Sequence, residues 1–218
     1  QIKGLHMATK NSQDGISMIQ TAEGALQETH GIIQRMRELA VQSANDTNTG
    51  EDREKLQLEI DQLAAEIDRV GNTTEFNTRV LMNGEYKDKG TTYHIGANKD
   101  QNVNLTFADM RSEALGLKGI QILDNPQANE AILTINNALE EVSNERAKYG
   151  AMQNRLEHTI NNLRVSEENL QAAESRIRDT DMASEMVKLN KDKIISQSGT
   201  AMLAQANTTP QGVLQLLR

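Results

Sequence analysis

The fold of this chain is decided by residues 135–177, which read INNALEEVSNERAKYGAMQNRLEHTINNLRVSEENLQAAESRI. An apolar side chain occurs at every seventh position of this stretch: Ile135, Val142, Tyr149, Leu156, Leu163, Leu170 and Ile177. This spacing keeps one side of an α-helix turned toward a partner along its whole length, about 63 Å at 1.5 Å per residue. Polar residues fill most other positions, so the stretch predicts a long helix in coiled-coil-like packing within an elongated rod.

The composition agrees with helix-on-helix packing. Only 2% of the 218 residues are aromatic, so short aliphatic side chains must supply most of the apolar contacts. The net charge is -8 without a run of Lys or Arg, and no stretch approaches the roughly 20 apolar residues of a membrane span. We therefore expect neither nucleic acid nor a membrane as a partner. The absence of Cys from the sequence excludes disulfides and thiolate metal sites.

Two further helices precede the long one. An apolar ladder predicts a helix over about residues 1–45: Ile19, Leu26, Ile33 and Ala40. The polar run at residues 45–50 ends it, and Thr49 and Asp52 have the spacing of a capping box. A second helix, over about residues 51–71, carries apolar residues at alternating intervals of four and three: Leu56, Ile60, Leu63, Ile67 and Val70.

Residues from about 73 to 123 predict a small β element, because the apolar period changes there. Val103, Leu105 and Phe107 alternate with polar residues, and Asn83-Gly84 signals a hairpin. Most of the aromatic residues fall in this stretch, so we expect the β element to have its own core. Asn125 and Pro126 are then predicted as the N-cap and first residue of the long helix, over about 126–178.

A last amphipathic arm, residues 180–218, follows a break at Asp179-Thr180-Asp181 and is interrupted at Thr208-Thr209-Pro210. Its candidate assembly residues are apolar: Met182, Met186, Leu189, Ile194, Ile195, Met202, Leu203, Leu214 and Leu217. No later segment remains to bury these side chains. The arm therefore packs back on the chain, stays without fixed structure, or binds another chain.

No residue pattern in the sequence indicates an enzyme. The four His residues are dispersed without metal-ligand spacing, and adjacent carboxylates such as Glu140 and Glu141 point about 100° apart on a helix. No phosphate-binding loop or nucleophile elbow is present. We therefore predict no catalytic residue, no cofactor and no metal site.

The segment Gln34–Asn45 combines two Arg and a Glu with apolar positions at the end of a helix. One interpretation is a capped helix end held by ion pairs. The other is an outward recognition patch, in which Arg makes bidentate contacts with a partner. The residues alone leave both open.

This segment and several others resemble bacterial flagellin, the subunit of the flagellar filament, and together they cover about two-thirds of the chain. The N-terminal matches are residues 11–17, 20–26 and 34–45, and the C-terminal matches are residues 153–163, 173–179, 201–207 and 214–218. The resemblance implies a structural subunit that self-assembles into a helical polymer for motility, located outside the cell.

The resemblance also implies a division of the chain. Residues 1–179 would form a rod domain of packed helices with a β-hairpin. Residues 180–218 would form the C-terminal half of the filament-core domain. By the same resemblance, the chain is expected to be a fragment that lacks the N-terminal helix of that domain.

Several partners follow from the resemblance as expectations: other flagellin subunits, the filament cap, an export chaperone on the arm, and the vertebrate Toll-like receptor for flagellin. Arg35, Leu39, Gln42 and Glu59 match positions that contact this receptor and neighbouring subunits in the filament. Export through the flagellar type III channel, without a cleavable signal peptide, is implied as well.

Two other kinds of protein share parts of this pattern. A hook–filament junction protein is a related axial protein, but such proteins diverge in the Arg37-Glu38-Leu39 segment. A signalling coiled-coil rod would lack the aromatic β segment and would need no apolar arm.

Overall fold

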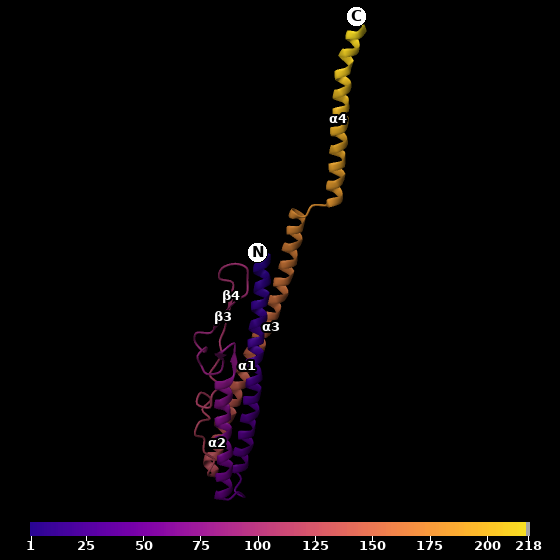
Figure 1. The fold of residues 1–218 in the computed structure, drawn as a ribbon. Helices are drawn as coiled ribbons and strands as arrows, with labels where there is room; N and C mark the ends of the chain where they lie inside the picture. The colour runs from indigo at the N-terminus through magenta and orange to yellow at the C-terminus, as the bar shows by residue number, and fades with distance from the viewer. Residues whose placement is uncertain (217–218) are drawn as a thin grey trace. The chain divides into compact units, whose positions relative to one another are not determined.

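The computed structural model describes the backbone of residues 1–216 and the side chains of residues 1–208. The chain divides into two compact units, Gln1–Leu170 and Gln171–Arg218. Its elements, labelled in part in Figure 1, are α1 (Ile2–Ser43), α2 (Gly50–Thr73), β1 (Glu75–Phe76), β2 (Arg79–Val80), β3 (Thr91–His94), β4 (Asn102–Leu105), α3 (Asn125–Arg178) and α4 (Met182–Leu216). The predicted class, long packed helices with a small β element and a C-terminal helical arm, is confirmed.

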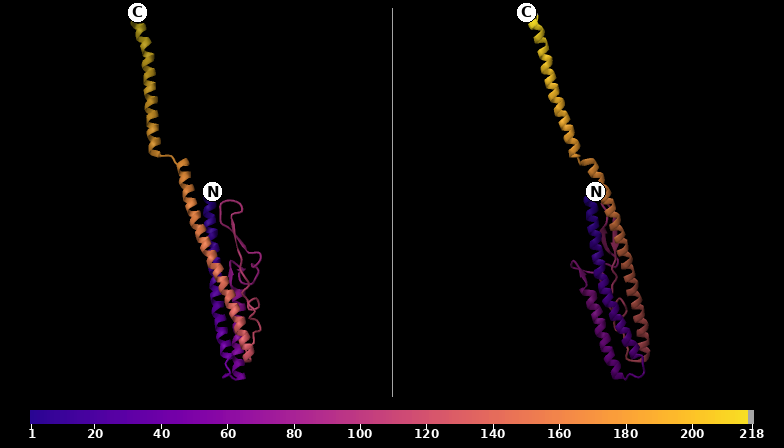
Figure 2. Two further views of the ribbon diagram at one scale, coloured as in Figure 1. Left: turned by 180° about the vertical axis from the view of Figure 1, so that it is seen from behind. Right: turned by 90° about the vertical axis from the view of Figure 1, so that its right-hand side faces the viewer.

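The first unit has one main apolar core, to which α1, α2, α3 and the β segment all contribute. Figures 1 and 2 show α1 and α3 side by side and antiparallel. The ladders of both helices meet in one buried cluster: Ile19, Leu26, Ile33 and Ala40 with Ile135, Val142, Tyr149 and Leu156. Leu163 and Leu170 continue the ladder against Leu5 and Ala8. The prediction fails only at Ile177, which is 88% exposed and belongs to the second unit.

The start of α2 is the predicted capping box. The Asp52 backbone N–H donates to Thr49 Oγ1 at 3.3 Å, and the Thr49 backbone N–H donates to Asp52 Oδ2 at 3.2 Å. These reciprocal bonds satisfy amide groups that a helix start leaves free. Hydrogen bonds from Thr49 lower the pKa of Asp52 below its usual range.

The cap of α3 differs from the prediction by one residue. The Gln127 backbone N–H donates to Asp124 Oδ1 at 2.8 Å, and the Ala128 backbone N–H donates to the Asp124 carbonyl oxygen at 2.9 Å. Asp124 is therefore the N-cap, and Asn125 is the first helical residue. The Asn125 amide instead donates to the carbonyl oxygen of Ala44 at 2.7 Å, which ties α3 to the end of α1.

The predicted hairpin at Asn83-Gly84 is wrong. These residues form a turn with φ of +83° at Gly84, but the two antiparallel pairs are β1 with β2 and β3 with β4. The tight turn between β1 and β2 is Asn77-Thr78, where both φ values are positive, 49° and 65°. A two-residue hairpin requires such angles, but a β-branched Thr rarely adopts them, which is why the sequence points elsewhere.

The β segment has no separate core, which corrects a second expectation. Val103, Leu105 and Phe107 are buried, as their alternation predicts, but they join the same cluster as the helices. The ring of Phe107 lies 5.5 Å from that of Tyr149 on α3, tilted by 56°. Two short strand pairs cannot bury enough apolar surface alone, so they pack on the helical seam.

In the second unit, α4 is one continuous helix from Met182 to Leu216. The break at Asp179–Asp181 is confirmed, because α3 ends at Arg178, whereas the interruption at Thr208–Pro210 is wrong. The boundary between the two compact units falls between Leu170 and Gln171, within α3. The division into a rod domain and half of a filament-core domain stays a prediction.

We predict that Thr49→Ala lowers the free energy of unfolding by about 1 kcal/mol at neutral pH, because a capping hydroxyl is lost. The pKa of Asp52 is lower in the folded state than in the unfolded state. The stability that ionised Asp52 contributes is therefore present above its unfolded pKa, about 3.9, and is lost as the pH falls through its folded pKa. The difference in the free energy of unfolding between Thr49→Ala and the wild type should therefore shrink near pH 3. Urea unfolding followed by circular dichroism measures the free energy of unfolding at neutral pH and near pH 3. An equal loss of stability in the control Thr47→Ala would contradict the capping role.

Candidate assembly and partner-binding surfaces

The first candidate surface lies where the end of α1 meets α2. Arg35 Nε donates to Glu59 Oε1 at 2.8 Å, and Arg35 Nη1 donates to Glu38 Oε2 at 3.0 Å. The hydrogen bond that Arg35 donates to Glu59 is the main reason that the pKa of Arg35 is raised. All three side chains remain substantially exposed, so this network positions charged groups at the surface while adding little stability. The structure thus brings together Arg35 and Glu59, as the predicted partner patch requires.

Leu39 is the exception in this patch. It is 0% exposed and packs in the main apolar cluster with Met36 and Ala40. Its position three residues after Met36 places it on the inward side of α1. The side chain of Leu39 is therefore buried within the chain, whereas Arg35 and Gln42 occupy exposed positions. Contact of Leu39 with a partner stays a prediction.

The bonds of this segment also support its structural interpretation. Arg37 Nε donates to Asn136 Oδ1 on α3 at 2.8 Å, so the polar side of α1 is joined to both neighbouring helices. Ser43 Oγ donates to the carbonyl oxygen of Ile122, which holds the last turn of α1 to the segment before α3. The segment is therefore a fixed helix end with exposed charged side chains.

We predict that Leu39→Ala lowers the free energy of unfolding by about 2–5 kcal/mol, because it leaves a cavity in the core. Val41→Ala, at a 49% exposed position two residues away, should change it by less than about 0.5 kcal/mol. Chemical denaturation of both variants compares the two sites. Equal, small effects would contradict the burial of Leu39.

The second candidate surface is α4. The predicted assembly residues whose side chains are described are all solvent-exposed, between 45% and 68%: Met182, Met186, Leu189, Ile194, Ile195, Met202 and Leu203. The side chain of Leu214 and the whole of Leu217 lie outside the described residues. Val187, which sequence reasoning omitted, is equally exposed at 68%.

The apolar residues of α4 do not share one face. At 100° per residue, Met182, Met186 and Leu189 fall within about 60° of one another. Ile195 and Met202 fall about 140–160° from Met182, on the opposite side. The expected amphipathic face is therefore wrong, and α4 presents apolar side chains on both sides. A helix that is apolar all round is normally buried between several neighbours.

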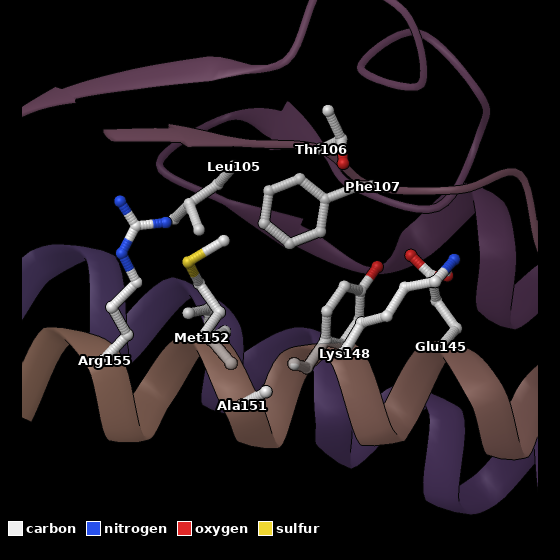
Figure 3. Close-up of a pocket in the computed structure, with 10 residues that line it drawn as sticks. Leu105, Thr106, Phe107, Glu145, Lys148, Ala151, Met152 and Arg155 are labelled. Atoms are coloured by element: carbon white, nitrogen blue, oxygen red, sulfur yellow. The ribbon is translucent and has the colours of Figure 1, made fainter. Parts of the chain in front are cut away.

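A cavity that sequence reasoning missed lies beneath the β segment (Figure 3). It is partly open to solvent, has a volume of about 370 Å³ and is lined by residues from α1, α3, the end of β4 and the two residues that follow β4. In Figure 3, Leu105 and Phe107 lie across this cavity from Met152 on α3. No sequence signal marks it, because it forms only where segments far apart in the chain pack together.

The described residues contain neither a candidate metal site nor a candidate membrane-spanning helix. Among residues 1–208, no three side chains of His, Asp or Glu gather as a metal ion would require. No helix of the described part combines the length and apolar character needed to cross a membrane. The exposed apolar side chains of α4 and the charged side chains at the end of α1 are the surfaces available to a partner.

These features define a structural protein that associates through its helices. Its terminal regions match two family models: "Bacterial flagellin N-terminal helical region" over residues 1–87 and "Bacterial flagellin C-terminal helical region" over residues 132–217. Flagellin of Bacillus subtilis strain 168 is 50% identical over 251 aligned residues, which include the whole of this chain and 82% of that protein. The chain belongs to the bacterial flagellin family and is a structural subunit of the flagellar filament.

Solved structures agree with the fold. The crystal structure of Bacillus cereus flagellin matches with a TM-score of 0.63 and 27% identity, over 83% of this chain and 94% of that one. A putative flagellar hook-associated protein of Vibrio parahaemolyticus reaches 0.66 at 12% identity, over 80% and 92% of the two chains. At 12% identity, the second match shows a shared fold alone. The 50% identity to Bacillus subtilis flagellin therefore favours flagellin over a junction protein.

Proposed function

We propose that α4 supplies subunit contacts within the flagellar filament. The observation that carries this proposal is the exposure of its large apolar side chains, with Met182 and Met202 each 68% exposed on opposite sides of the helix. Burial of such side chains contributes about 1.5–3 kcal/mol each. Apolar residues on both sides favour an arrangement in which neighbouring subunits surround α4, rather than one in which it pairs with a single helix.

The other expected partner of α4 is an export chaperone. An export chaperone that covers the Met, Ile and Leu side chains of α4 would keep the subunit soluble before assembly. Met suits such exchange of partners, because its flexible thioether adapts to different surfaces. We also propose that the subunit is exported without a cleavable signal peptide and adds beneath the filament cap, outside the cell.

We predict that Leu189→Lys together with Ile195→Lys shortens or abolishes filaments, because two charges would enter the apolar contacts on opposite sides of α4. Electron microscopy of cells that make the variant measures filament length. The control, Lys188→Arg with Lys191→Arg, changes two neighbouring positions and preserves their charge.

The comparison must separate failed assembly from failed folding. Circular dichroism of the purified variant should show that the helices of the first unit are retained. Filaments of normal length in cells with the doubly charged variant would contradict the role of α4.

We further propose that Arg35, Gln42 and Glu59 form a patch for binding the vertebrate flagellin receptor and neighbouring subunits. The 2.8 Å ion pair between Arg35 and Glu59 supports the patch, because it fixes groups from α1 and α2 next to each other. Arg presents a rigid fork of donors that suits recognition of a partner's carboxylate or carbonyl groups. Leu39 would act only by packing beneath these residues.

We predict that Arg35→Ala with Gln42→Ala lowers receptor activation by roughly tenfold or more, since paired contacts at an interface are lost. Unfolding by urea should hardly change, because both positions are exposed. A receptor-reporter assay measures activation, and Arg164→Ala, an exposed position on α3, serves as the control. Equal receptor activation by the wild type, the double variant and Arg164→Ala would contradict receptor binding at this patch.

A further inference from the structure

We infer that the cavity between α3 and the end of β4 is a binding site for a small amphipathic anion, such as a medium-chain carboxylate. The cavity is partly open to solvent and has a volume of about 370 Å³, which falls within the about 300–1,000 Å³ usual for small-molecule sites. The inference does not depend on the proposed role of α4, because every lining residue belongs to the first unit.

The apolar part of the site is built from three segments. Ile19 comes from α1, Leu105 and Phe107 from the end of β4, and Met152 from α3. Ile19 and Phe107 are 0% exposed and belong to the main core, so they hold this wall in place from behind, while the half-buried Met152 supplies apolar surface that a ligand can touch. A pre-formed apolar wall suits the hydrocarbon part of a ligand, because no rearrangement is needed to bury it.

The charged part of the site favours an anion. Lys148, Glu145 and Arg155 all line the cavity, and together they carry a net charge of one positive unit. Lys148 Nζ binds the buried Glu145 carboxylate at 2.7 Å, so this pair neutralises itself. Arg155 takes part in no ion pair of the described residues and lies beside Met152 in Figure 3. An anionic head group would bind Arg155 while its apolar tail packs on Met152 and Leu105.

The ligand would join segments that are distant in the chain. Bound between α3 and the end of β4, it would hold the β segment against the helical seam and stabilise the folded state by mass action. The ligand would thus act on the first unit and leave α4 unchanged.

Methyl NMR with 13C-labelled methionine tests the site directly, because the nine Met residues include one in the cavity and several on α4. Octanoate is the probe, and Met152→Leu assigns the Met152 signal. We expect a saturable shift of Met152 with a dissociation constant in roughly the millimolar range, which suits a ligand of this size. The signals of Met182, Met186 and Met202 should stay in place.

Three variants decide which groups bind the probe. Ala151→Leu fills the cavity from an exposed lining position and should abolish the shift, whereas Ala147→Leu adds the same atoms one turn away, outside the cavity, and should preserve it. Arg155→Gln should weaken binding by roughly tenfold, since a charged contact becomes neutral.

Two results would overturn the inference. One is an unchanged Met152 signal, or equal shifts in every variant and on α4. The other is a Met152 shift that follows protein concentration without octanoate, because a second copy of the chain would then occupy the cavity.

Discussion

The packing of α1 against α3 is the constraint on which the first compact unit depends. With few aromatic residues in the sequence, its core is mainly aliphatic and includes residues such as Leu26 on α1 and Val142 on α3, both 0% exposed. The β segment has no core of its own and covers this seam through Phe107 and Tyr149. Hydrogen bonds from Arg37 to Asn136 and from Asn125 to the carbonyl oxygen of Ala44 also join α1 and its end to α3.

Features that depend on local spacing could be predicted from the sequence. The ladder from Ile135 to Leu163 and the Thr49–Asp52 capping box follow from the geometry of a single helix, and both are present. Features that depend on distant packing could not. The hairpin turn falls at Asn77-Thr78 against the conformational preference of Thr, and the cavity exists only because the end of β4 lies over α3.

The site predictions divide in the same way. Residue types on the end of α1 indicated a charged surface, and Arg35 with Glu59 forms one. Leu39 matches the same segment of the family pattern, yet its place three residues after Met36 sends it into the core. A sequence match assigns residues to a motif, whereas helical periodicity decides which of them a partner can touch.

Aliphatic residues of the same kinds are buried in the first compact unit and exposed in the second. In the first unit such residues pack within the chain, whereas on α4 they remain exposed on both sides of the helix. An isolated helix gains little stability in water without a packed face. Under the proposed assembly role, neighbouring subunits would cover these side chains in the filament.

Hydrogen exchange by mass spectrometry, on intact filaments and on the monomers released from them, tests most directly whether α4 serves assembly. We expect the α1–α3 seam to exchange slowly in both states, and α4 to exchange rapidly in monomers and slowly in filaments. Slow exchange of α4 in monomers, or no gain in protection on assembly, would contradict this role.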